Sequence, residues 1–165
     1  MEYVEEPTTQ PTKVATLNAN WNYNRRGAMT GIVIVTHGQL GDALIDAAEM
    51  IIGKKPEAVV SVSISITSQA DTLREKIKKK IDEVKSDDGV LILTDMFGGS
   101  PSNLSYSFLE EGSIDVISGV NLPILLKAID IRGKMPLAES VEKIIDFGKR
   151  SVSLASGILK GNKRN

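Results

Sequence analysis

The 165-residue sequence contains no cysteine, which excludes disulfides, thiolate nucleophiles and cysteine-based zinc sites. It contains a single histidine, His37, whereas zinc hydrolases and histidine phosphatases normally use more than one. No apolar run approaches the roughly 18 residues that span a bilayer, so membrane insertion is not expected. The formal net charge of −1 argues against nucleic acid as the main partner, because phosphate backbones are bound by basic surfaces.

Residues 1–28 differ from the rest of the chain. This stretch is polar, contains Pro7 and Pro11 and shows no hydrophobic period, so we predict a flexible tail outside the domain. Met29 stands just before the first apolar run, where translation could begin. We place one domain at residues 29–156 and a C-terminal end at residues 157–165, a size that can bury a substantial core.

From residue 31 onward, strand patterns alternate with helix patterns. Residues 31–36 (GIVIVT) and 89–94 (GVLILT) are almost wholly apolar, which is typical of strands buried on both faces. Residues 60–66 (VSVSISI) alternate between apolar residues and serines, which indicates a half-exposed strand nearer the sheet edge. A fourth strand is predicted at residues 114–119, and the alternation at 151–155 (SVSLA) indicates a late strand.

Helices are predicted between these strands from apolar residues at helical spacing. The expected helices are residues 40–52 with Gly53 as the C-terminal cap, a segment capped by Ser68, a short segment after Ser100, a segment opened by Asn121 and Pro123, and a last segment that ends near Gly148. Acids alternate with lysines in REKIKKKIDE (74–83), so we interpret this run as a solvated helix face rather than a binding surface.

Strands that alternate with helices predict an α/β domain, with an open, mostly parallel sheet and helices on both of its faces. The two wholly apolar strands belong at the centre and the alternating strand lies outside them, which gives the strand order 2-1-3-4. The chain then reverses its winding direction between strands 1 and 3. Ligand sites form at such a switch point, beyond the C-terminal ends of the strands.

His37 and Asp95 follow the two central strands, so the switch point should bring them together. A neutral imidazole is a nucleophile near pH 7, provided that one ring nitrogen carries no proton. A carboxylate that accepts a hydrogen bond from the other nitrogen fixes this tautomer and steadies the ring. Asp95 is the candidate for that role. A lone histidine is more often structural than catalytic, and this placement is what favours chemistry.

The GGSP run at residues 98–101 supplies a candidate anion site. Gly99 and the glycine before it allow a tight turn and a close approach to a ligand. Ser100 fits a helix N-cap and Pro101 the first helical position, and the free N–H groups of a helix N-terminus bind anions. A phosphoryl group suits the site, with added hydrogen bonds from Ser100 and Thr36. The P-loop spacing is absent, and taken alone this run would be an ordinary capped turn.

Three stretches carry a family resemblance: IVIVTHGQLGDALIDAAEMIIG, GVLILTDMFGGSPSN and VISGVNLPILLKAI. Together they resemble the enzyme IIA component, mannose family, of the bacterial phosphoenolpyruvate:sugar phosphotransferase system. The resemblance implies that His37 accepts a phosphoryl group from the phosphocarrier HPr and passes it to a IIB component, with Asp95 as its partner and Ser100 near the phosphate. It also implies a cytoplasmic homodimer in which the strand at 151–155 is antiparallel and is exchanged between subunits.

We therefore expect a phosphotransferase that works through a phosphohistidine in sugar uptake and associates at most with a membrane sugar permease. Thr36, Ser100 and the N–H groups near Gly99 are expected to hold the phosphoryl oxygens, and these residues require no metal or organic cofactor. A regulatory module that reports phosphotransferase flux by protein binding has the same chemistry at His37. The sequence leaves both functions open, together with a non-catalytic small-ligand module. The phosphocarrier subunit of dihydroxyacetone kinases shares the fold, but the DMFGGSPSN loop is closer to the sugar-transport branch.

Overall fold

The computed structural model describes residues 29–65 and 67–159. The predicted tail, residues 1–28, lies outside the described residues, as do Ile66 and residues 160–165. Within the described part, strands and helices follow one another in turn as far as the fourth helix, which confirms the predicted α/β class.

Four strands and six α-helices make up this part of the chain. The strands are β1 (Gly31–His37), β2 (Val59–Ile64), β3 (Val90–Thr94) and β4 (Ile114–Ser118). The helices are α1 (Leu40–Ile52), α2 (Ala70–Val84), α3 (Ser100–Ser105), α4 (Leu122–Ile131), α5 (Leu137–Ser151) and α6 (Ala155–Leu159). A short 3₁₀ turn, η1 (Tyr106–Phe108), extends α3.

All four strands are parallel and lie in the order β2-β1-β3-β4, as the apolar patterns predict. In the centre of the sheet, Val33 of β1 pairs with Val60 of β2 and with Ile92 of β3. On its other side, Ile92 pairs with Val116 of β4. The winding direction therefore reverses between β1 and β3, whose C-terminal ends meet at one edge of the sheet.

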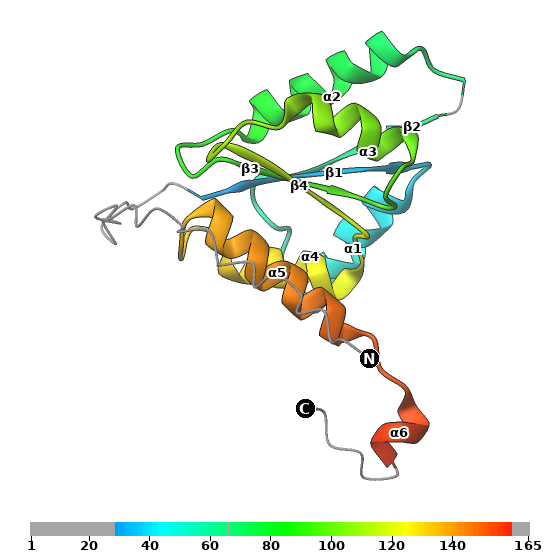
Figure 1. Cartoon of the computed structure of the whole chain (residues 1–165), viewed down its shortest axis with the longest axis vertical. Coiled ribbons are helices and arrows are strands. Elements are labelled where there is room, and N and C mark those ends of the chain that lie inside the picture. The colour runs from blue at the N-terminus through cyan, green and yellow to red at the C-terminus, as the bar shows by residue number, and fades with distance from the viewer. Residues whose placement is uncertain (1–28, 66, 160–165) are drawn as a thin grey trace, which may run out of the picture.

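Helices cover both faces of the sheet (Figure 1). Helices α2 and α3 lie over one face, and α1, α4 and α5 lie over the other. Successive residues of β1 serve the two faces in turn: Ile32 and Ile34 belong to the core beneath α1, α4 and α5, whereas Val33 and Val35 belong to the core beneath α2 and α3. All four are fully buried. This alternation decides which way the last residues of β1 point.

The helix starts show where the capping predictions succeed and fail. Asn121 caps α4 as predicted, because its side-chain oxygen accepts a hydrogen bond from the Ile124 N–H at 2.9 Å. Ser68 does not cap α2, and that prediction is wrong. The N-cap position belongs to Gln69, whose side chain makes no capping bond. The backbone enters the helix at Gln69, one residue after Ser68, so the Ser68 hydroxyl does not stand at the N-cap position.

Helix α1 covers the predicted range, but it buries a narrower face than its apolar residues suggest. Its buried residues are Gly41, Ile45 and Ala48. At its C-terminal end Ile51 is 60% exposed, and Gly53 takes the left-handed cap conformation as predicted. No helix in the described part of the chain combines the length and apolarity needed to cross a bilayer.

The C-terminal region differs most from the prediction. Helix α5 continues past Gly148 to Ser151, because that glycine is a packing residue and not a cap. A Cβ atom on Gly148 would lie 2.6 Å from the side chain of Ile124 on α4. Residues 152–154 have no regular structure, and α6 stands off the body of the domain (Figure 1). The single chain forms no strand at 151–155, so the exchanged antiparallel strand stays a prediction about two chains.

The first residue of β1 is expected to tolerate no side chain. A Cβ atom on Gly31 would overlap the carbonyl oxygen of Val84, at the end of α2, and would lie 2.7 Å from its Cγ2 atom. Because a helix carbonyl cannot move alone, Gly31→Ala should lower the free energy of unfolding by about 1–3 kcal/mol in urea titrations. Gly157→Ala is the control, because its Cβ atom meets nothing within 4 Å. Equal stability of the two variants would contradict the close approach of β1 and α2.

Candidate functional site

His37 is the last residue of β1, and its side chain continues the alternation of that strand. Val33 and Val35 face α2 and α3, and His37 therefore points to the same side. Its side chain is 41% exposed at the C-terminal edge of the sheet. Gly38 then takes a positive φ of 53°, which glycine adopts readily, and turns the chain toward α1.

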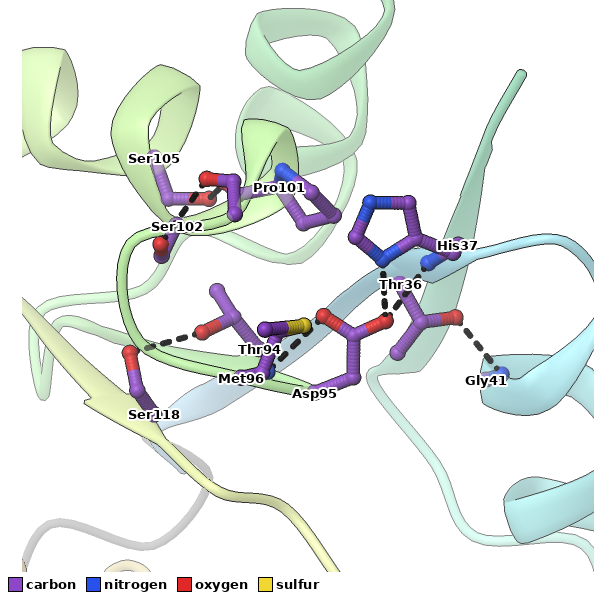
Figure 2. A network of polar contacts seen from close by, with 11 residues as sticks. Thr36, His37, Gly41, Thr94, Asp95, Met96, Pro101, Ser102, Ser105 and Ser118 are labelled. Carbon is purple, nitrogen blue, oxygen red and sulfur yellow. Dashed lines mark hydrogen bonds and ion pairs between the residues drawn. The ribbon is translucent and has the colours of Figure 1, made fainter. Parts of the chain in front are cut away.

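Asp95 follows β3 and accepts three hydrogen bonds (Figure 2). Its Oδ2 atom lies 2.8 Å from the backbone N of His37 and 2.8 Å from the ring Nδ1 of the same residue. Its Oδ1 atom accepts from the backbone N–H of Met96 at 2.9 Å. The structure thus brings His37 and Asp95 together across 58 positions of the sequence, at the predicted switch point.

The carboxyl group of Asp95 is ionised at neutral pH. Burial acts to raise its pKa, but hydrogen bonds from the His37 backbone and ring and from the Met96 N–H outweigh burial, so the pKa of Asp95 lies below its ordinary value of 3.8. An ionised carboxylate only accepts hydrogen bonds, so Nδ1 of His37 must be the donor. In the neutral ring, Nε2 then carries a free electron pair. The imidazole is therefore a nucleophile at Nε2.

Gly99 lies against the edge of this imidazole. A Cβ atom on Gly99 would be 3.1 Å from Cε1 of His37, the carbon between the two ring nitrogens. Gly99 is also the N-cap of α3, which makes Ser100 the first helical residue and Pro101 the second. The predicted cap is therefore displaced by one residue. The reason is Gly98, whose φ of +78° ends the turn early and leaves Gly99 extended at the cap position.

Two serine hydroxyl groups bond to backbone carbonyl groups at the start of α3 (Figure 2). Ser102 donates to the carbonyl oxygen of Gly99 at 3.0 Å, and Ser105 donates to that of Pro101 at 2.7 Å. Both serines are fully buried. Helix α3 has only six residues, and these two bonds satisfy the carbonyl groups of its N-cap and second residue.

Thr36 does not face this site, which corrects its predicted role as a phosphoryl ligand. It precedes His37 on β1 and therefore points to the opposite face of the sheet, where it is fully buried. Its hydroxyl accepts a hydrogen bond from the Gly41 N–H at 2.9 Å (Figure 2). This bond satisfies an N–H group in the first turn of α1. Thr36 thus anchors the helix that follows His37.

A cleft of about 310 Å³ opens beside His37. Ser100 lines it, and so do Ser65, Arg74 and Asn103, for which the sequence patterns predict no role at the site. Asn103 could have been found from its place in the GGSPSN motif. Arg74 lies in the run that the charge pattern marks as a solvated face, and it is indeed 49% exposed. Only the packing of α2 beside the sheet edge shows that it also reaches the cleft.

The fold and the site together define a class: an open parallel α/β domain with an accessible nucleophilic histidine at its switch point. Residues 31–145 match the family model described as "PTS system fructose IIA component". The chain therefore belongs to the family of IIA components of the sugar phosphotransferase system (PTS), in agreement with the resemblance of its three motifs.

Individual relatives come from the same system. The chain is 30% identical over 129 residues to the PTS system fructose-specific EIIA component of Bacillus subtilis strain 168, covering 78% of this chain and 88% of that protein. It is 34% identical over 123 residues to the PTS system mannose-specific EIIAB component of Escherichia coli strain K12, covering 73% of this chain and 38% of that longer protein. A crystal structure of the phosphotransferase component EIIA from Streptococcus agalactiae matches with a TM-score of 0.68 and 27% identity, covering 78% and 98% of the two chains.

The tautomer of His37 should depend on Asp95. In the neutral ring of the wild-type protein we expect the Nδ1–H form to dominate. Asp95→Asn replaces two acceptor oxygens by one, at a point where three N–H groups converge. Because the Asn amide NH₂ can also donate to Nδ1, the variant should raise the share of the Nε2–H form. The ¹⁵N shifts of the ring report this directly, because the chain has no second histidine. Asp82→Asn, exposed on α2, is the control; Asp95→Asn shifts equal to those of the control would refute the assignment.

Proposed function

We propose that the protein is a phosphocarrier of the sugar phosphotransferase system. His37 accepts a phosphoryl group from phospho-HPr and passes it to a histidine of a IIB component during sugar uptake. The observation that carries the proposal is the contact between Asp95 and Nδ1 of His37. It leaves the other ring nitrogen unprotonated on the side of the ring away from Asp95 (Figure 2).

The transfer step is a displacement at phosphorus. The electron pair on Nε2 of His37 attacks the phosphorus atom in line, and the N–P bond of phospho-HPr breaks with its electron pair returning to the donor histidine. A new N–P bond forms on His37, and Nδ1 keeps its proton throughout. The ring gains positive charge in this step, and the Asp95 carboxylate 2.8 Å away stabilises that charge. Transfer to the IIB component repeats the step in the opposite sense.

Gly99 and Ser100 are the proposed ligands of the phosphoryl oxygens. Gly99 lies against the imidazole, and Ser100 lines the cleft beside it, so both stand where the oxygens of a group on Nε2 would be. Loss of one preorganised donor of this kind typically slows a reaction by about 10²–10³-fold. Asp95→Asn, which weakens the hold on the ring, is expected to slow transfer while the fold stays intact.

The surroundings of His37 suit a protein partner. The ring is 41% exposed, and the neighbouring Met96 and Phe97 are 56% and 79% exposed. Apolar side chains at the surface beside a reactive group are typical of protein contact sites. HPr and the IIB component are the partners that we propose for this surface, in the cytoplasm and with a membrane sugar permease as the further destination of the phosphoryl group.

We also propose that the protein is a homodimer. Val152 and Leu154, in the segment after α5, are 82% and 73% exposed, and a second chain would cover them. Among the described residues no further strand pairs with the outer side of β2, and the outer side of β4 pairs only at Ile114, which bridges Glu110, so an exchanged strand could pair at either edge. Sedimentation equilibrium should give twice the 17.8 kDa mass of the chain. A mass of one chain at micromolar concentration would contradict this proposal and leave the chemistry at His37 unaffected.

Phosphorylation of His37 is the direct test of the proposed function. Incubation with phosphoenolpyruvate, enzyme I and HPr should place an acid-labile phosphate on the wild-type protein. His37→Ala should take up none, because no second histidine is available. Asp82→Asn is again the folded control and should be labelled like the wild type. A folded wild-type protein that a cognate HPr does not label would refute the proposal, together with the regulatory function that the sequence leaves open, because both require a phosphohistidine.

A further inference from the structure

The cleft beside His37 is lined by a charged residue, Arg74, that belongs neither to the stretch around His37 nor to the DMFGGSPSN loop. His37 and Ser100 line it from the sheet edge and α3, whereas Arg74 lines it from α2. Among the described residues that line this cleft, Arg74 is the only one with a permanently cationic side chain. We propose that the guanidinium group of Arg74 binds the phosphoryl group carried by His37. This inference rests on the proposed phosphocarrier function and adds a binding residue to it.

Charge distinguishes Arg74 from the other residues that line the cleft. A phosphoryl group on a side chain carries about −1.5 to −2 charges at neutral pH. On Nε2 it would stand across the ring from the Asp95 carboxylate, which is 2.8 Å from Nδ1. The hydroxyls of Ser65 and Ser100 can donate hydrogen bonds but bring no positive charge. Arg74 brings a charge together with a planar fork of donors that matches phosphoryl oxygens.

Arg74 is available for this contact. Its Nη1 atom pairs with Oδ1 of Asp71 at 3.0 Å, one turn earlier on α2. The two side chains are 49% and 94% exposed, and ion pairs between such groups contribute little to stability. A phosphoryl group offers more charge and a bidentate geometry. Arg74 can therefore exchange Asp71 for the phosphoryl group, and Asp71 acts as a competitor while His37 is unmodified.

The backbone beneath Arg74 is fixed by the core. Leu73 and Ile77 of α2 are 3% and 0% exposed and belong to the cluster that also contains Val33 and Val35 of β1. Leu73 itself lines the cleft. The guanidinium is thus carried on a flexible side chain from a rigid helix, which suits a group that must bind and release a phosphoryl group as it passes.

The experiment uses the full chain phosphorylated with phosphoenolpyruvate, enzyme I and HPr. Two quantities are measured: the equilibrium partition of the phosphoryl group between HPr and the protein, and the ³¹P chemical shift of phosphorylated His37. Arg74→Gln should move the partition about tenfold toward HPr, the effect of one charge-assisted hydrogen bond, and should change the ³¹P shift. Arg74→Lys should be intermediate, because it keeps the charge without the fork.

The matched control is Lys78→Gln. It removes the same charge from the next turn of α2, at an exposed residue that does not line the cleft, and should behave like the wild type. Asp71→Asn removes the competitor and should move the partition toward the protein. Both variants leave the core of α2 unchanged, so folding does not obscure the comparison.

Several results would overturn the inference. A wild-type partition and ³¹P shift in Arg74→Gln would do so, and so would an equal loss in Lys78→Gln, which would reduce the effect to overall charge. A loss in Asp71→Asn as large as that in Arg74→Gln would show that the surface ion pair itself is what matters. A wild-type chain that accepts no phosphoryl group would instead refute the phosphocarrier function.

Discussion

The site depends on the carboxylate of Asp95. One of its oxygens binds both the backbone N–H and the ring of His37, so it fixes the end of β1 and the orientation of the side chain together. The second oxygen is held by the Met96 N–H, which prevents the carboxylate from turning away. The same three bonds keep the pKa of Asp95 below its ordinary value, so its carboxylate is ionised at neutral pH and accepts the hydrogen bond from Nδ1 of His37.

The fold supplies this contact by burying β3 entirely and β1 up to its last residue, His37. Because β1 and β3 are covered on both faces, they occupy the centre of the sheet and end side by side. The last two residues of β1, Thr36 and His37, then point to opposite faces of the sheet. His37 faces α2 and α3, where the cleft lies, while Thr36 faces α1 and binds the N–H of Gly41. The reactive group and the support for the next helix thus come from consecutive positions.

The sequence alone was enough to predict the strand order and the meeting of His37 with Asp95, because burial patterns and the geometry of parallel sheets determine both. The prediction that Thr36 binds the phosphoryl group is wrong, because the two-residue period of a strand places Thr36 opposite His37. Gly148 matched a helix-end signal, but its close contact with Ile124 is a tertiary fact that no local pattern contains. Arg74 could not be found for the same reason, since the seating of α2 decides which of its basic residues reaches the cleft.

The bond between Asp95 and His37 joins residues 58 positions apart, so it exists only when β1 and β3 are paired. In an unfolded chain the imidazole has no carboxylate partner, and its two tautomers interconvert freely. The reactive nitrogen is therefore a property of the native state and not of the histidine itself. In the proposed function, a partly unfolded copy therefore accepts phosphoryl groups poorly and does not compete with folded copies for phospho-HPr. The nitrogen that accepts the phosphoryl group in this proposal is therefore assigned by a contact that only the folded chain can make.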